Sequence, residues 1–165
     1  MQESPAYVAV VGPGDEATHQ DREVAGRVGR LLAERGAVLV CGGLGGVMEA
    51  AARGARDGGG LSIGLLPGRD RGAANAALSV ALATGLGELR NGLVVAASDA
   101  VIAVGGSWGT QSEIALAMRM GKPVVTVNGW AVEVPAGSPA RPLAFAASAD
   151  EAISTIYDAL TAADA

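Results

Sequence analysis

Short runs of apolar residues alternate along the chain with longer segments in which apolar side chains recur at helical spacing. The short runs cover residues 7–11, 37–41, 61–66, 78–82, 99–104 and 122–127. Continuous apolar runs of this length are typical of parallel strands that are covered on both faces. Helical segments are expected around residues 24–32, 47–56, 88–96, 111–120 and 148–160. The alternation predicts an α/β protein with a parallel sheet and helices on both of its faces.

Three of the predicted strands end in turns that are dense in glycine. Glycine can adopt positive φ and brings bare backbone N–H groups close to an anion, and the amino end of the following helix adds positive potential. Because the carboxyl ends of parallel strands meet at one edge of the sheet, we expect these turns to line one crevice. The residues predicted to bind a phosphate there are Gly12, Gly42, Gly43, Gly45, Gly46, Gly105, Gly106, Ser107, Trp108, Gly109 and Thr110.

The segment after residues 99–104 also contains Glu113 and Trp108, and each of these side chains could have either a structural or a functional role. Thr110 and Glu113 stand in the T-x-x-E relation of a capping box, in which the hydroxyl caps the helix and the carboxylate reaches back to the cap residue,. Glu113 would then be structural, although a carboxylate at the amino end of a helix could also face the crevice and act in catalysis. Trp108 would either stack on a ligand ring or cover the sheet edge.

Two basic regions lie close to the predicted crevice in the order of the chain. Arg90 opens a helical segment, and a guanidinium near glycine turns suits a phosphate because it can donate two parallel hydrogen bonds,. The polar segment 67–75 has the length of a loop over a site, and its Arg69 and Arg71 are interpreted as surface charges,.

Composition narrows the class of protein. The chain of 165 residues has a net charge of -5 and only 3% aromatic residues, so a basic face with stacking platforms for nucleic acid is not expected,. Cys41 is the single cysteine, which excludes an intramolecular disulfide, and neither it nor His19 has partners at metal-binding spacing,. No apolar run reaches the ~18 residues of a membrane span, and the start of the chain lacks a basic signal region. We therefore predict one cytoplasmic domain over residues 1–165, without a metal.

Four motifs in order resemble the LOG superfamily. They are GGLGGVM at 42–48, IGLLPG at 63–68, TGLGELRN at 84–91 and SDAVIAVGGSWGTQSE at 98–113. The superfamily includes cytokinin-activating phosphoribohydrolases, once described as lysine decarboxylases, the molybdenum-cofactor carrier proteins and the nucleotide-binding part of DprA/Smf proteins. The resemblance implies a Rossmann-like three-layer sandwich, usually dimeric, with a nucleotide-phosphate site at the glycine turns. Thr84, in the third motif, and Asn75 upstream of it join the predicted ligand-binding residues.

The resemblance also implies two catalytic positions. In the hydrolase branch, a paired arginine and glutamate cleave a nucleoside 5'-monophosphate to free base and ribose 5-phosphate, and Arg90 and Glu113 match those two residues. Two features depart from the hydrolase pattern. Asn91 follows Arg90, where the hydrolases have a lysine. The hydrolases have Pro-Gly-Gly before an aromatic residue, whereas Gly-Gly-Ser at 105–107 precedes Trp108 here. These departures favour the branch that resembles the molybdenum-cofactor carriers.

Two functions follow as hypotheses. The first is a binding protein that holds a nucleoside monophosphate or a molybdopterin-type cofactor and forms a homodimer or a larger homo-oligomer. The alternative is a nucleoside 5'-monophosphate phosphoribohydrolase that uses Arg90 and Glu113, and whether the protein is an enzyme stays open. Neither function needs a further cofactor, a membrane or nucleic acid. The net negative charge of the chain disfavours DNA binding of the DprA kind.

Overall fold

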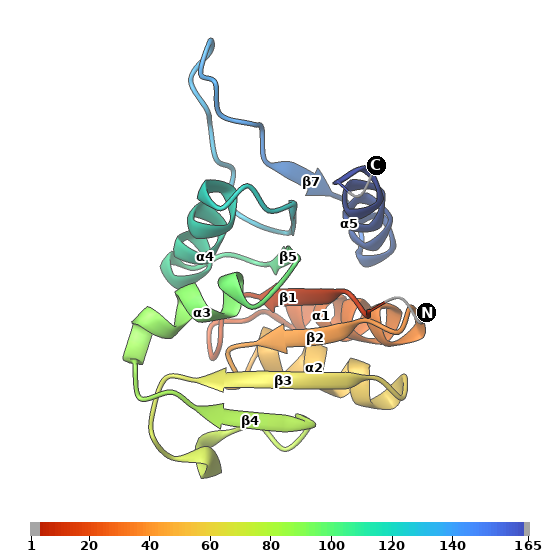
Figure 1. Ribbon diagram of the computed structural model, residues 1–165, viewed down its shortest axis with the longest axis vertical. Coiled ribbons are helices and arrows are strands. Elements are labelled where there is room, and N and C mark those ends of the chain that lie inside the picture. Colours follow the sequence, from red (N-terminus) through yellow and green to blue (C-terminus); the bar gives the residue numbers. More distant parts are fainter. Residues whose placement is uncertain (1–3, 164–165) are drawn as a thin grey trace.

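The fold is built on one parallel sheet that runs through the centre of the molecule (Figure 1). The computed structural model describes residues 4–163. Within them the strand order is β4-β3-β2-β1-β5-β6-β7, and every neighbouring pair is parallel. The strands are β1 (Tyr7–Val11), β2 (Val38–Cys41), β3 (Leu61–Leu66), β4 (Val80–Ala83), β5 (Ala100–Val104), β6 (Val124–Val127) and β7 (Ala144–Ala146).

Helices cover both faces of this sheet and make it the middle layer of three. The helices are α1 (His19–Glu34), α2 (Val47–Asp57), α3 (Arg90–Ala96), α4 (Trp108–Arg119) and α5 (Ala149–Ala163), with short 3-10 turns η1 (Arg71–Ala73) and η2 (Gly87–Leu89). Alternate residues of β1 face opposite layers: Val8 and Val10 join the core under α1, α2 and α5, whereas Ala9 and Val11 join the core under α3 and α4,. The predicted Rossmann-like three-layer α/β fold is therefore confirmed.

The strand order reverses at β1. From β1 the chain adds β2, β3 and β4 on one side, and then returns to place β5 on the other side of β1, where Val11 pairs with Ala103. In open parallel sheets the connections at such a switch point separate beyond the carboxyl ends of the strands, and a crevice forms there. The glycine turns that follow β1 and β5 flank this point.

Three sequence predictions need correction. The edge strand β7 was missed, because three residues after a Pro- and Gly-containing segment carry too little periodicity to predict a strand,. The fourth strand begins at Val80 rather than at residue 78, since Leu78 belongs to a turn in which its N–H donates to the Asn75 carbonyl. The helix expected at residues 111–120 begins at Trp108, one turn earlier.

Lys122 ties the layer of α3 to the sheet. Its ammonium group donates hydrogen bonds to the carbonyl oxygens of Val95 (2.8 Å), Ala96 (2.9 Å) and Ser98, at the end of α3. The Val95 carbonyl also accepts the Ser98 N–H at 3.2 Å, and a cation at a helix carboxyl end is favoured by the helix dipole,.

We expect Lys122→Met to lower the free energy of unfolding by about 2 kcal/mol, because three charge-assisted hydrogen bonds are lost from a partly buried position. Urea denaturation measures the change. Arg119→Met, which removes a positive charge from an exposed position on α4, serves as the control. Equal losses in the two variants would mean that charge alone, and not the three bonds, accounts for the effect.

Candidate functional site

A crevice of about 300 Å³ lies at the carboxyl ends of the strands, beside the switch point,. It brings together the segments that follow β1, β2, β3 and β5 and the start of α3. Its walls are formed by Val11, Gly12, Pro13, Gly14, Gly42, Leu44, Met48, Pro67, Glu88, Arg90, Asn91, Ser107, Gly109, Thr110 and Glu113. The predicted meeting of the three glycine turns in one crevice is therefore present in the structure.

Arg90 is the buried cation of this crevice. It is the first residue of α3 and is only 7% exposed. Its Nε–H is buried and has no hydrogen-bond partner in the part of the chain that the structure describes. Burial lowers the pKa of the Arg90 guanidinium, and the nearby Glu113 carboxyl acts in the opposite direction. A buried, incompletely paired guanidinium costs free energy, so it points to a missing acceptor.

Gly42 makes room for the Arg90 side chain. A Cβ atom built on Gly42 would overlap the Arg90 Nη1 nitrogen and would lie 2.7 Å from the Met48 sulfur. The guanidinium thus rests directly on the backbone at the end of β2. A residue with a Cβ atom at this position would displace the Arg90 side chain.

We expect Gly42→Ala to weaken anion binding about tenfold while it changes the unfolding free energy by only about 1 kcal/mol. The added methyl displaces the flexible end of Arg90 rather than the backbone, so the site suffers more than the fold,. Titration calorimetry with ribose 5-phosphate and urea denaturation give the two numbers. Gly68→Ala, where a Cβ atom meets nothing within 4 Å, is the matched control. Unchanged affinity in Gly42→Ala would show that the position of Arg90 does not matter for binding.

Glu113 is the buried acid of the crevice. It lies in the second turn of α4 and is 7% exposed. Burial raises the pKa of the Glu113 carboxyl to about 8, although the Arg90 charge acts to lower it. Within residues 4–163, no ion pair of 4.0 Å or less joins Glu113 to a basic group. At neutral pH the Glu113 carboxyl is therefore mostly protonated, and it does not neutralise the buried charge of Arg90,.

The amino end of α4 opens onto the same crevice through Ser107, Gly109 and Thr110. The cap residue of α4 is Ser107: its Oγ accepts a hydrogen bond from the Thr110 N–H at 3.2 Å and contacts the Thr110 hydroxyl at 2.9 Å. The capping box expected between Thr110 and Glu113 is therefore wrong, because α4 begins two residues before Thr110 and Ser107 already caps it. Glu113 has no capping role in α4, and Gly109 and Thr110 of the first turn line the crevice.

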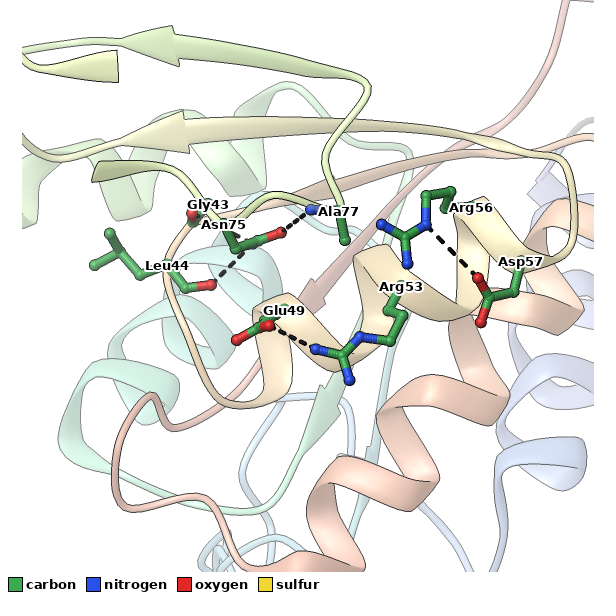
Figure 2. Close-up of polar contacts among 8 residues, drawn as sticks. All are labelled: Gly43, Leu44, Glu49, Arg53, Arg56, Asp57, Asn75 and Ala77. Atoms are coloured by element: carbon green, nitrogen blue, oxygen red, sulfur yellow. Dashed lines mark hydrogen bonds and ion pairs between the residues drawn. The ribbon is translucent and has the colours of Figure 1, made fainter. Parts of the chain in front are cut away.

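Two predicted ligand residues shape the crevice from outside. The side-chain amide of Asn75 donates to the carbonyls of Gly43 (3.3 Å) and Leu44 (2.9 Å), and its oxygen accepts from the Ala77 N–H at 3.1 Å (Figure 2). Thr84 donates its hydroxyl to the Leu66 carbonyl at 2.7 Å. Asn75 thus holds the backbone of the glycine turn after β2, Thr84 holds the end of β3, and neither lines the crevice.

The other predicted contacts divide between the crevice and its surroundings. Gly12, Gly42, Ser107, Gly109 and Thr110 line the crevice together with Arg90 and Glu113. The remaining ones lie in the turns around it and are not part of the lining: Gly43, Gly45, Gly46, Gly105, Gly106 and Trp108. Met48 and Glu88 line the crevice but were missed by sequence reasoning. The position of Glu88, two residues before Arg90 in the third motif, is the only signal for it.

A larger hollow of about 630 Å³ lies over the outer side of α1 and α2. It is rich in charge, but several of its charged side chains are paired: Arg53 contacts Glu49 at 2.6 Å, and Asp57 contacts Arg56, which lies outside the lining, at 3.6 Å (Figure 2). These ion pairs are exposed and contribute little free energy. The crevice beside Arg90, with its unpaired buried groups, is the better candidate for a ligand site.

Neither a metal cluster nor a membrane helix is found in the described part of the chain. No group of three or more His, Cys, Asp or Glu side chains between residues 4 and 163 is arranged to hold a metal ion. Over the same residues, no helix has the length and apolarity to cross a membrane.

The parallel sheet, its covering helices and the crevice at the switch point define a Rossmann-like α/β protein. More specifically, the chain belongs to the SLOG cluster4 family, whose family model matches residues 5–158. An uncharacterized protein of Archaeoglobus fulgidus is 48% identical over 123 residues, which cover 73% of this chain and 79% of that protein. The predicted kinship with the LOG group is thereby confirmed.

Solved structures of the same fold include molybdenum cofactor proteins. The molybdenum cofactor binding protein of Rippkaea orientalis superposes with a TM-score of 0.85 and 34% identity, over 96% of this chain and 99% of that one. The molybdenum cofactor carrier protein of Chlamydomonas reinhardtii gives a TM-score of 0.84 and 31% identity, again over 96% and 99%. The likeness extends over nearly the whole of each chain.

Proposed function

We propose that this protein binds a small phosphorylated ligand and holds its phosphate in the crevice beside Arg90. The observation that carries the proposal is the buried Arg90 guanidinium, whose Nε–H lacks an acceptor at the wall of the crevice. A phosphate oxygen is the acceptor that a guanidinium fork fits best. Ser107, Thr110 and the first-turn N–H groups of α4 would supply further donors,.

The charge balance of the crevice supports an anionic ligand. With the Glu113 carboxyl protonated at neutral pH, the buried charge of the crevice is the positive charge of Arg90, whereas the Glu88 carboxylate in the lining is exposed to solvent. The amino end of α4 adds partial positive charge from the same side. A phosphate would neutralise both.

A molybdopterin-type cofactor or a nucleoside monophosphate would satisfy this chemistry. The similar proteins of R. orientalis and C. reinhardtii are described by their binding or carriage of the molybdenum cofactor, which favours the first. The residues present here fit its phosphate, since Arg90, Ser107 and Thr110 can hold an oxyanion. When bound, the cofactor would bring the metal with it, so no protein cluster for the metal is needed.

Calorimetric titration of the purified protein tests the proposal. Inorganic phosphate, ribose 5-phosphate and GMP are titrated separately, and the protein as purified is examined for molybdenum and for an oxidised, fluorescent pterin. We expect ribose 5-phosphate to bind to wild-type protein and to bind much more weakly to Arg90→Met. If none of the phosphorylated compounds binds and no pterin is retained, the proposal is wrong.

A phosphoribohydrolase is the second candidate, and one observation favours it. Glu113 is a buried carboxyl group with a raised pKa, it faces the crevice beside Arg90, and it is not used as a helix cap. Buried acids of this kind are frequent in active sites that cleave glycosidic bonds. Incubation with a panel of nucleoside 5'-monophosphates, followed by mass spectrometry for free base and ribose 5-phosphate, tests this function. Release that disappears in Glu113→Gln would favour the hydrolase over the carrier.

Three further expectations stay predictions. They are assembly into a homodimer or a larger homo-oligomer, a cytoplasmic location and the lack of nucleic-acid binding. Light scattering of the purified protein measures the first, and titration with single-stranded DNA measures the last.

A further inference from the structure

Trp108 stands on the rim of the crevice with its side chain in water. It is the first residue of α4 and is 81% exposed, although an indole is among the most costly side chains to leave in solvent,. A second hollow, of about 500 Å³, lies against it. Besides Trp108, its apolar walls are Leu89, Gly92 and Leu116. This volume is sufficient for a fused two- or three-ring heterocycle.

The Trp108 indole is held in place by its neighbours. Its ring packs edge-on against Trp130, with the two ring centroids 5.1 Å apart and the planes at 85°. Trp130 in turn rests on Gly106, where a Cβ atom would overlap the Trp130 ring. The contact with Trp130 favours this orientation of Trp108 before a ligand binds, which reduces the entropy that a stacked complex would lose,.

The hollow beside Trp108 adjoins the crevice beside Arg90. Glu88, Asn91 and Gly109 line both of them. Asn91 donates a hydrogen bond of 3.3 Å to the Ser112 hydroxyl, which itself donates to the Gly109 carbonyl at 2.7 Å, so the Asn91 amide oxygen and the Glu88 carboxylate are the polar groups available at one side of the hollow. These groups can bond to the ring nitrogens and exocyclic groups of a heterocycle, while the indole face stacks on the ring.

We infer that the hollow beside Trp108 binds the fused nitrogen heterocycle of the ligand whose phosphate is held at Arg90. This inference rests on the proposed function and adds to it a ring subsite and the residue that selects for an aromatic ring. Trp108 stacks on the ring, and Asn91 and Glu88 contact its polar edge. The ligand class is accordingly a phosphorylated purine or pterin rather than a sugar phosphate alone.

The test separates the phosphate from the ring. Ribose 5-phosphate, GMP and 6-hydroxymethylpterin phosphate are titrated into wild-type protein, Trp108→Leu, Trp108→Phe and the control Leu61→Ala, an exposed apolar side chain at the start of β3. We expect GMP or the pterin phosphate to bind wild-type protein at least tenfold more tightly than ribose 5-phosphate. Trp108→Leu is expected to remove most of that preference with ribose 5-phosphate affinity unchanged, and Trp108→Phe to restore part of it.

A spectroscopic signal complements the affinities. In a Trp130→Phe protein, Trp108 is the only tryptophan, so stacking of a ring quenches its fluorescence directly. Quenching by GMP or the pterin phosphate but not by ribose 5-phosphate is the expected result. Light scattering of Trp108→Leu shows whether the hollow is instead covered by a second copy of the chain.

Each other outcome overturns the inference in a recognisable way. If ribose 5-phosphate binds but the ring preference is missing or survives in Trp108→Leu, the ring subsite is wrong and the proposed function stands. If Trp108→Leu changes the molecular mass and leaves the preference intact, the hollow belongs to an interface between copies. If wild-type protein binds none of the three compounds and its Trp108 is not quenched, both the subsite and the proposed function are wrong.

Discussion

Replacing Arg90 with methionine is expected to weaken the binding of ribose 5-phosphate about 100-fold. Two charge-assisted hydrogen bonds to the phosphate are lost, together with the positive charge that attracts it. The fold should tolerate the change, because the Arg90 guanidinium is buried with an unpaired Nε–H and its removal relieves a cost,. We therefore expect Arg90→Met to unfold at the same urea concentration as wild-type protein or at a higher one. Calorimetry and urea denaturation measure the two effects.

Two further variants sharpen this prediction. Arg90→Lys keeps the charge but not the planar fork, so its affinity should fall between those of the wild type and of Arg90→Met. Arg71→Met removes an exposed arginine from the loop before Asn75 and should leave the affinity within about twofold,. If Arg71→Met and Arg90→Met weakened binding equally, general electrostatic attraction would explain the binding and the crevice would lose its role.

The stability of the protein is expected to fall as pH rises from about 5 to 9, and Glu113 is expected to account for much of the fall. The folded protein holds the proton of the Glu113 carboxyl up to a pKa of about 8, whereas the ordinary value is 4.5. Below pH 4.5 this group is protonated in both states and costs nothing. Between these two values the unfolded chain releases the proton and the folded chain does not, so stability declines, and above pH 8 it levels off.

A neutral isostere isolates this effect. Because one pKa unit corresponds to about 1.4 kcal/mol, we expect Glu113→Gln to gain about 4 kcal/mol on the wild type between pH 5 and pH 9. Urea denaturation at pH 5, 7 and 9 measures the gain, since the other titrating groups act alike in both proteins. The control is Glu88→Gln, which replaces an exposed side chain that lines the same crevice. Its free energy of unfolding should change with pH as that of the wild type does. If the curves of wild type and Glu113→Gln were parallel, the Glu113 carboxyl would have to be ionised at neutral pH.

The fold could be predicted from the sequence largely because its strands are continuous apolar runs. Residues 61–66 were predicted at the observed bounds of β3, and the predicted strand at 37–41 differs from β2 by one residue. Such runs are buried on both faces and do not depend on a distant partner for their pattern. The edge of the sheet was less predictable: β4 and β7 are short and partly exposed, and their position depends on pairing with β3 and β6,.

The candidate site could be predicted as a set of residues but not as an arrangement. The sequence indicated Arg90, Glu113 and the glycine turns, and the structure brings these into one crevice. The sequence could not indicate which of Ser107 and Thr110 caps α4, because serine and threonine both cap helices and these two residues lie three positions apart,. Nor could it indicate that Asn75 bonds to the backbone at Gly43 and Leu44, since that contact joins segments about 30 residues apart,.

Cys41 gives the protein a built-in chemical probe of its own crevice. It is the single cysteine, it ends β2 directly before Gly42, and it is fully buried. Burial raises the pKa of its thiol to about 11, so at neutral pH the group is both protonated and inaccessible,. A thiol reagent can therefore react only in molecules whose strand end has opened. The rate at which the Cys41 thiol is labelled in the wild-type protein therefore measures how often the end of β2, which lies against Arg90, unfolds locally,.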